Sequence, residues 1–286
     1  MKYLNFLKLS GLFLMILLVG CEPLEEVTSN IIIDAIDNTL QPTPTQQPIV
    51  NGDDTISIAS FNIQILGKTK VSKAIVEEYL PQIIRQYDIV AIQELRDVSD
   101  ETINTLKRWL PEYQFVVSER LGRSTSKEQY IIAYREGKVL STGIYDDVND
   151  IFEREPQITY MSIQGKDFTI INNHIKPDAA EQEIRDLDYV IDYALTIDPD
   201  FILVGDLNAD CGYYNEDLNY LKEYNWAIGN ELDTNVAASE CTYDRIILNM
   251  NYVNSGVDDY GFTFGLTPQQ QSVISDHRPV WVTLDG

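Results

Sequence analysis

The chain contains two histidines, and each stands among amides and acidic residues. His174 occurs in Ile-Ile-Asn-Asn-His-Ile-Lys-Pro, and His277 occurs in Ser-Asp-His-Arg-Pro-Val. Imidazole is the side chain whose unperturbed pKa lies nearest neutrality, so a pair of imidazoles can supply both the base and the acid of a hydrolytic reaction. The two histidines therefore predict a hydrolase.

Polar side chains able to bind a metal stand where apolar runs end or begin. Rigid strands hold such side chains in place, and we expect them to meet in one cleft. Carboxylate and amide oxygens suit a hard cation such as Mg²⁺, whereas two histidines without a cluster of free thiols do not suit zinc. With Mg²⁺ polarising a phosphoryl oxygen and the imidazoles moving protons, the set predicts phosphodiester hydrolysis. Its members are Asn62, Glu94, His174, Asp206, Asn208, Asp276 and His277.

The spacing of apolar residues predicts a domain of strands and helices. Residues 72–87 and 179–195 show helical spacing, and Pro81 is expected to kink or end the first helix. This order of elements predicts an α/β or α+β sandwich with sheets at the centre and helices outside. The predicted strands are residues 56–61, 89–93, 130–134, 157–163, 168–172, 201–204, 245–248 and 280–284.

The start of the chain has the pattern of an export signal. Lys2 and Lys8 precede an apolar run that is short for a membrane span, and Leu18-Val19-Gly20-Cys21 resembles a bacterial lipobox. We expect an exported, membrane-anchored lipoprotein that faces the periplasm or the exterior; an uncleaved anchor is the alternative. The expected parts are a signal peptide at residues 1–20, lipidated Cys21 with a polar tether at residues 21–54, and a catalytic domain at residues 55–286.

The formal net charge is −24, with 45 acidic residues against 21 lysines and arginines. Phosphate contacts normally come from basic patches, so this balance argues against binding to nucleic acid driven by charge alone. It leaves room for a nucleic-acid enzyme that uses local basic residues and bound divalent cations.

If Cys21 is acylated, Cys211 and Cys241 remain as a pair, and an exported compartment permits a disulfide between them. Such a bridge would close a loop of roughly thirty residues and stabilise the fold by about 3 kcal/mol on the chain-entropy estimate. Two unpaired buried thiols are the alternative.

Several sequence blocks resemble the signature blocks of the endonuclease/exonuclease/phosphatase superfamily. They are Phe61-Asn62-Ile63, Ile92-Gln93-Glu94, Gly205-Asp206-Leu207-Asn208-Ala209-Asp210 and Ser275-Asp276-His277. More specific strings resemble the deoxyribonuclease I family, in order and with similar spacing, over most of the chain. They are Gln93-Glu94-Leu95-Arg96-Asp97, Ser118-Glu119-Arg120-Leu121-Gly122-Arg123, Ser126-Lys127-Glu128-Gln129-Tyr130, Phe152-Glu153-Arg154-Glu155-Pro156, Asn208-Ala209-Asp210-Cys211 and Cys241-Thr242-Tyr243-Asp244-Arg245-Ile246.

The resemblance implies a four-layered α+β (α/β) sandwich in which two central mixed β-sheets are flanked by helices. It implies a monomeric, divalent-metal-dependent endonuclease that cuts double-stranded DNA to 5′-phosphate ends with little sequence specificity. Mg²⁺ would be the cofactor, with Mn²⁺ as a substitute and Ca²⁺ as a further candidate ion. Cys211 and Cys241 would form the family's structural disulfide.

The resemblance also implies a role for each site residue. His174 and His277 would be the acid and base, with Glu128 orienting the first and Asp244 the second. Arg96 and Arg154 would contact DNA in the minor groove and at the phosphates, where readout follows groove width more than sequence. The metal and scissile phosphate would lie among Glu94 as principal ligand, Asn62, Asp206, Asn208 and Asp276.

Three departures from the family pattern bear on these expectations. Ser126 stands where the family has a tyrosine that packs against a DNA sugar, so we expect a weaker grip on duplex DNA. The family's small second disulfide has no counterpart in residues 145–154. One calcium loop keeps an acidic ligand at Asp233, with Asn235, Ala237 and Ser239 in place of threonines. Asp147, Asp150 and Glu155 are candidates for a second calcium site, and a solvated acidic loop is the alternative.

Two other functions fit parts of the pattern. A phosphoesterase acting on phospholipid or inositol-phosphate substrates would share the superfamily core, but Arg96, Arg154 and the paired cysteines argue against it. A surface binding protein on a decayed nuclease fold is the other alternative, and the intact acid/base residues argue against that decay.

Overall fold

The structure is a computed structural model, and it describes residues 55–286. The expected signal peptide, lipidated Cys21 and tether lie outside the described residues. Within residues 55–286, no helix combines the length and the apolar character that crossing a membrane requires.

Two six-stranded β-sheets form the centre of the domain. In the first, the order is β11-β12-β1-β2-β4-β3, and in the second it is β5-β6-β7-β8-β10-β9. Each sheet is mixed, since β1 runs parallel to β2 and β7 runs parallel to β8 while the other neighbours are antiparallel. The first sheet contains β1 (Thr55–Leu66), β2 (Ile89–Leu95), β3 (Gln114–Val117), β4 (Gln129–Tyr134), β11 (Asn254–Val257) and β12 (Val280–Asp285). The second contains β5 (Lys138–Ile144), β6 (Gln157–Ile163), β7 (Lys166–His174), β8 (Phe201–Asp206), β9 (Asn225–Trp226) and β10 (Asp244–Leu248).

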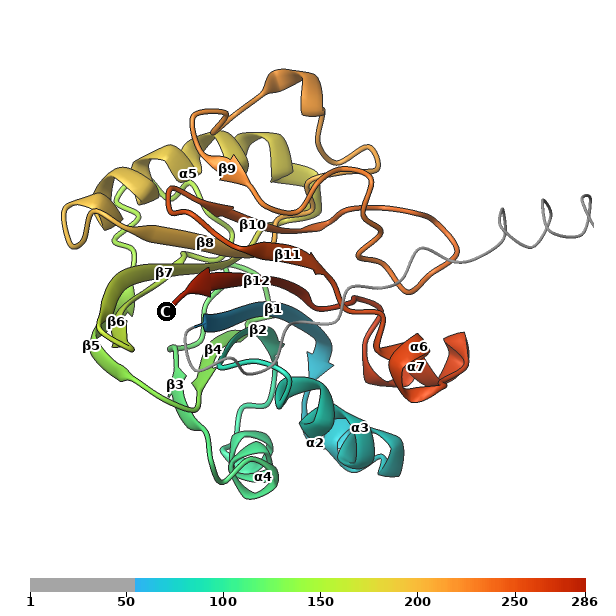
Figure 1. The fold of residues 1–286 in the computed structure, drawn as a ribbon. Helices are drawn as coiled ribbons and strands as arrows, with labels where there is room; N and C mark the ends of the chain where they lie inside the picture. Colours follow the sequence, from blue (N-terminus) through green and yellow to red (C-terminus); the bar gives the residue numbers. More distant parts are fainter. Residues whose placement is uncertain (1–54) are drawn as a thin grey trace, which may run out of the picture. The chain divides into compact units, whose positions relative to one another are not determined.

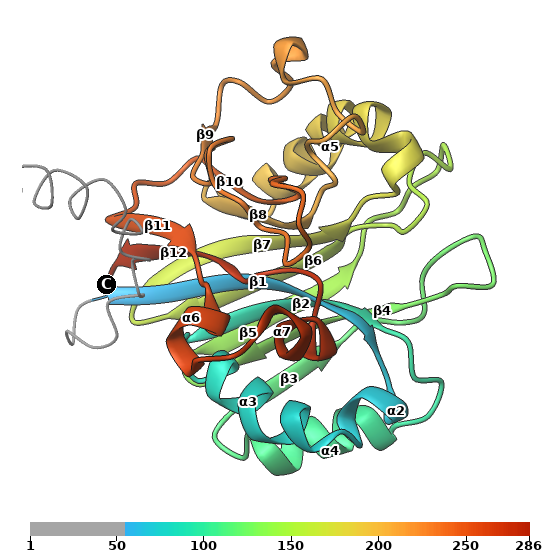
Figure 2. The ribbon, with the colours of Figure 1, turned by 90° about the vertical axis from the view of Figure 1, so that its right-hand side faces the viewer.

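Helices cover the outer face of each sheet, which gives the predicted four-layered sandwich (Figure 1). The first sheet is covered by α2 (Lys68–Val71), α3 (Ala74–Ile84), α4 (Glu101–Trp109), α6 (Tyr260–Phe264) and α7 (Pro268–Ile274), and the second by α5 (Ala180–Leu195). Two short 3₁₀ helices, η1 (Pro177–Ala179) and η2 (Glu216–Leu218), lie in the connections. Figure 2 shows α5 on one side of the stacked sheets and α2, α3, α4, α6 and α7 on the other.

Alternation along the strands decides which side chains lie between the sheets. In β1, Ile56 and Ile58 pack in the core between the two sheets, whereas Ala59, Phe61 and Ile63 pack under the helices. Successive side chains of a strand point to opposite faces, so Asn62 lies on the same face of β1 as Ile56 and Ile58, toward the second sheet. Asn62 is fully buried.

All eight predicted strands are present, because each is a run of apolar residues that is buried on at least one face. The sequence analysis missed β3, β5, β9 and β11, which lie at or next to sheet edges and are short or largely exposed. The two predicted helices correspond to α3 and α5. The helix α3 does not end at Pro81 but continues to Ile84.

Candidate active site

Three predicted catalytic residues lie side by side at the end of the second sheet. In the register of β7, β8 and β10, His174 pairs with Asp206, and Asp206 pairs with Asp244. Phe168 and Ile170 of β7 pack between the sheets, so the even positions that end in His174 share that face. The same alternation brings Asp206 and Asp244 to this face, and the three side chains meet because neighbouring strands end together.

The imidazole of His174 is held by a buried carboxylate. Its Nδ1 lies 2.7 Å from Oε1 of Glu128, and the Glu128 side chain is fully buried. Burial alone would lower the pKa of His174, but the charge and hydrogen bond of Glu128, together with the charge of Asp206, outweigh it and raise the pKa above its ordinary value. Because Nδ1 is committed to Glu128, Nε2 is the atom that can exchange a proton with a substrate.

The imidazole of His277 is held in the same way by Asp244. Its Nδ1 lies 2.8 Å from Oδ2 of Asp244, a carboxylate that is fully buried. Burial disfavours the charged ring, but Asp244 and Asp206 outweigh that effect and raise the pKa of His277 to about 10. Burial likewise raises the pKa of Asp244, to about 6, and the charge of Asp244 in turn favours the protonated form of the His277 imidazole.

Asp206 lies between the two imidazoles. Its Oδ2 is 3.5 Å from Nε2 of His174 and 3.5 Å from Nε2 of His277. The backbone N–H of Asn208 donates to Oδ1 at 3.1 Å. Burial opposes ionisation of Asp206, but the facing histidines outweigh it and lower the pKa of the carboxyl. The predicted acid/base pair therefore faces a single ionised carboxylate.

Glu94 reaches the site through a break in strand alternation. Val90 and Ile92 of β2 pack under the helices, so simple alternation would point Glu94 to the same side. Instead, Glu94 has a φ of 66°, and the pairing of β2 with β4 is irregular between Ile92 and Leu95. Its Oε1 lies 3.4 Å from Nδ2 of Asn62. A non-glycine residue in the left-handed region costs conformational energy and is often found at functional sites.

Asn62 connects Glu94 to Asp206. Its Nδ2 donates to Asp206 at 2.9 Å, while its Oδ1 is buried and has no hydrogen-bond partner among residues 55–286. The amide nitrogen of Asn62 faces the carboxylates of Glu94 and Asp206, and the same side chain holds a buried oxygen without a partner in the described part of the chain. Carboxylate and amide oxygens of this kind suit a divalent cation that prefers oxygen ligands. The donor set of Asn62, Glu94 and Asp206 therefore fits Mg²⁺ or Mn²⁺.

The carboxylates of Asp244 and Asp276 border the set formed by Asn62, Glu94 and Asp206. Asp206, Asp244 and His277 each offer a ligand atom, and these atoms lie within 4.8 Å of one another. Asp276, a predicted metal ligand, accepts from Nε2 of Gln64 at 2.6 Å, and its side chain is 42% exposed. Asp276 thus lies at the solvent edge of the site, while Glu94 and Asp206 lie inside it.

The two arginines predicted to contact DNA differ in exposure. Arg96 lies 3.1 Å from Oε2 of Glu94, and its side chain is 27% exposed. Arg154 is buried, and its Nε donates to the backbone carbonyl of His174 at 2.9 Å and lies 3.4 Å from Glu128. Arg154 therefore supports His174 and Glu128 from within the fold, and a DNA contact for either arginine stays a prediction.

Three of the four candidate calcium ligands have protein partners. Asp147 accepts from the N–H of Phe152, and Asp150 pairs with Arg123 at 2.9 Å. Glu155 lines the same hollow as Asp147, which has a volume of about 410 Å³. In the loop of residues 233–241, Asp233 pairs with Arg278 at 2.7 Å. Calcium binding at these residues stays a prediction.

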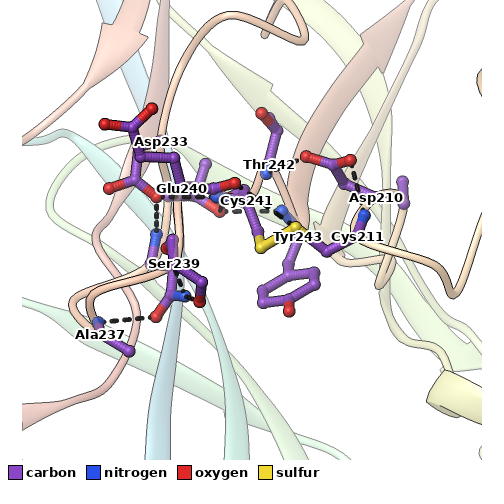
Figure 3. Close-up of a disulfide and its surroundings, with 12 residues drawn as sticks. Asp210, Cys211, Asp233, Ala237, Ser239, Glu240, Cys241, Thr242 and Tyr243 are labelled. Carbon is purple, nitrogen blue, oxygen red and sulfur yellow. Dashed lines mark hydrogen bonds between the residues drawn. A yellow bond between two sulfur atoms is a disulfide. The ribbon is translucent and has the colours of Figure 1, made fainter. Parts of the chain in front are cut away.

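Cys211 and Cys241 form a disulfide, which confirms the pairing considered from the sequence (Figure 3). Their Cα atoms are 5.7 Å apart. The bridge joins the segment that follows Asp206 to the segment that precedes Asp244, so it fixes the connections on both sides of the row of site residues. Beside it, Oδ2 of Asp210 accepts the N–H of Thr242 at 2.7 Å.

Three hydroxyl groups support the site, and the sequence analysis did not single them out. The hydroxyl of Tyr130 accepts the N–H of His174, and that of Thr234 accepts the N–H of Asp244. Ser275 donates to the carbonyl of Asn62 at 2.6 Å and accepts the N–H of His277. Ser275 directly precedes Asp276 and His277, which could have drawn attention to it; Tyr130 reads as a core strand residue and Thr234 as an ordinary loop residue.

Comparison with known proteins shows the family to which the chain belongs. Residues 59–277 match the Endonuclease/Exonuclease/phosphatase family, and the chain belongs to that family. It is 36% identical over 263 residues to Deoxyribonuclease-1 of Bos taurus, covering 80% of this chain and 92% of the relative. It is also 36% identical over 266 residues to Deoxyribonuclease-1-like 1 of Bos taurus, covering 82% of this chain and 83% of the relative.

Solved structures share the fold at lower identity. An endonuclease/exonuclease/phosphatase from Bacteroides vulgatus is 17% identical with a TM-score of 0.60, over 80% of this chain and 98% of that chain. TDP2 of D. rerio, complexed with single strand DNA product, is 16% identical with a TM-score of 0.58, over 81% of this chain and 99% of that chain. The predicted fold class is therefore confirmed.

Proposed function

We propose that the protein is a divalent-metal-dependent endonuclease that hydrolyses DNA to 5′-phosphate ends with little sequence specificity. The observation that carries the proposal is the arrangement of His174 and His277. Each has Nδ1 on a buried carboxylate, and each presents Nε2 at 3.5 Å from the same oxygen of Asp206. The similarity to Deoxyribonuclease-1 supports DNA as the substrate.

In the proposed reaction, a water oxygen attacks the phosphorus and the bond between phosphorus and the 3′ oxygen breaks. His277, whose pKa is raised to about 10, is the proton donor to the leaving oxygen. His174 takes the proton of the attacking water at Nε2, and Glu128 stabilises the imidazolium that forms. Asn208, whose Nδ2 donates to the carbonyl of Ile175 at 2.9 Å, keeps the loop beside Asp206 in place.

Glu94, Asn62 and Asp206 would hold Mg²⁺ or Mn²⁺, with Asp276 at the solvent edge. The bound cation would polarise a phosphoryl oxygen and offset negative charge in the site. Glu94 is itself oriented by the N–H of Ile65, which donates to its Oε2 at 2.8 Å. Ca²⁺ at Asp147, Asp150 and Glu155 would act as a separate structural ion.

DNA binding would depend on local cations, because the chain as a whole is strongly acidic. Arg96 is partly exposed beside Glu94 and would contact a backbone phosphate near the metal. Ser126 is exposed and would leave a sugar uncovered, so the grip on duplex DNA should be weak. We further propose that the protein is an exported monomer anchored to a membrane through lipidated Cys21.

Cleavage of supercoiled plasmid tests the proposal. We expect nicked, then linear and fragmented DNA in Mg²⁺ or Mn²⁺, and no cleavage after chelation of the metal. Sphingomyelin and inositol phosphates are tested in parallel as substrates of the alternative class. Intact plasmid with a folded protein, together with release of phosphate esters from those substrates, would overturn the proposal.

A further inference from the structure

Asp233 closes the loop of residues 233–241 through hydrogen bonds and also forms an ion pair with Arg278. Oδ1 of Asp233 accepts the N–H groups of Asn235 at 3.0 Å and Cys241 at 3.1 Å. Its Oδ2 lies 2.7 Å from Nη1 of Arg278, and that same nitrogen donates to the carbonyl of Asp233 at 3.1 Å. The two oxygens of Asp233 thus serve two functions: one closes the loop and the other binds a guanidinium.

This loop contacts the residues on both sides of the His277–Asp244 pair. The N–H of Arg278 donates to the carbonyl of Thr234 at 2.7 Å, and Asn235 forms an isolated β-bridge with His277. The hydroxyl of Thr234 accepts the N–H of Asp244 at 3.2 Å. A shift of the loop would therefore move the imidazole and its carboxylate relative to each other.

The loop contains no positive charge of its own. Residues 231–244 include the acidic residues Glu231, Asp233, Glu240 and Asp244 and neither lysine nor arginine. Arg278 comes from the segment that enters β12, and its side chain is 19% exposed. A guanidinium that is largely shielded from solvent and makes two contacts to one residue is better ordered than an exposed ion pair.

We propose that Arg278 is a positioning residue for His277, and that its guanidinium supplies the cation that holds loop 233–241 without bound calcium. The proposal rests on the proposed function in one respect, since the effect on catalysis requires His277 to act in the reaction. Under this proposal, Asp233 binds Arg278 and does not act as a calcium ligand. The proposal does not concern the second candidate calcium site, at Asp147, Asp150 and Glu155.

The geometric part of the proposal is tested by nuclear magnetic resonance without any substrate. The chain has two histidines, so the imidazole signals of His174 and His277 can be assigned by removing one ring at a time. We expect Arg278→Ala to shift the His277 signals and leave those of His174 in place, and Arg278→Lys to restore them in part. Unchanged His277 signals in a folded Arg278→Ala protein would overturn the proposal.

Calcium is tested in the wild-type protein through the amide signals of Asn235 and Cys241, which donate to Asp233. We expect these two signals to stay unchanged when calcium is added to protein freed of metal. If calcium moves them as far as Arg278→Ala does, the loop is held by calcium and the proposal is wrong.

The catalytic part is tested by kinetics with matched variants. We expect Arg278→Ala to lower kcat roughly ten- to hundredfold with KM unchanged, as for a displaced catalytic group. Arg135→Ala is the control, because Arg135 pairs with Asp88 at the same distance of 2.7 Å, at the end of β4 remote from Glu128. An equal loss in the control, or a rise in KM alone, would contradict a positioning role. If the wild type cuts no DNA, the proposed function fails while the resonance result still decides the role of Arg278.

Discussion

Replacing Asp244 by asparagine would show how strongly this carboxylate raises the pKa of His277. Burial lowers the pKa of this imidazole, and the carboxylates of Asp244, Asp206 and Asp276 together raise it from 6.5 to about 10. Asp244 is the strongest of the three and contacts Nδ1 directly. Its loss should lower the pKa of His277 by on the order of one unit, or about 1.4 kcal/mol.

The same change should disable catalysis. An amide nitrogen in place of Oδ2 cannot accept the proton of Nδ1, so the ring loses its orientation and its preferred tautomer. We expect kcat to fall by about 10²- to 10⁴-fold, the range for losing a general acid or the carboxylate that orients it. The assay is a titration of the His277 ring signals by nuclear magnetic resonance, together with kcat on plasmid DNA.

Asp258→Asn is the matched control for this prediction. Asp258 is also a fully buried carboxylate whose pKa is raised by burial, to about 6, but it binds Tyr87 and Gln86 under the first sheet. Neutralising it should leave the titration of His277 unchanged. The reasoning would be refuted by an Asp244→Asn protein that is folded, keeps the pKa of His277 near 10 and retains most of its kcat.

Three further predictions concern the scaffold. In Gly205→Ala, the new Cβ would lie 1.7 Å from the carbonyl oxygen of Asn173 at a φ of +150°, so denaturant unfolding should show a loss of more than about 4 kcal/mol or no folded protein; a stable variant would show that β7 and β8 can separate there. Burial raises the pKa of Glu183 from 4.5 to about 7, so the folded state binds a proton more tightly than the unfolded state, and stability falls as pH rises through this window. Glu183→Gln should remove that fall and be more stable above pH 7 by up to about 3 kcal/mol in denaturant titrations, with no difference below pH 4.5; an unchanged pH profile would contradict it. Replacing Cys211 and Cys241 by serine should cost about 3 kcal/mol in the same assay, and a variant as stable as the wild type would contradict the loop-closure argument.

Strand placement predicted His174 and Asp206 as site residues, whereas Asp244 was predicted from the family resemblance. His174, Asp206 and Asp244 each continue the apolar pattern of a strand, and the sheet register then aligns them. Such placement depends on local burial, which apolar periodicity reports well. The edge strands escaped prediction because one exposed face and a short length leave little pattern to detect.

Other features depend on contacts that no local pattern contains. Glu94 occupies a left-handed conformation that a sequence would sooner assign to glycine or asparagine. Arg278 and Asp233 are 45 residues apart, and only the fold shows that this guanidinium contacts a carboxylate considered as a calcium ligand. Arg154 was predicted to contact DNA, yet its burial beside His174 depends on tertiary packing.

Cleavage of an end-labelled DNA duplex under single-turnover conditions tests the central claim most directly. The wild type, His174→Ala and His277→Ala would be compared at saturating enzyme in Mg²⁺, with product ends identified by their sensitivity to phosphatase. We predict 5′-phosphate products from the wild type and a loss of at least about 10²-fold in rate for each variant, because each ring moves a proton in the reaction. Cleavage at the wild-type rate by either folded variant would contradict the account of a paired acid and base.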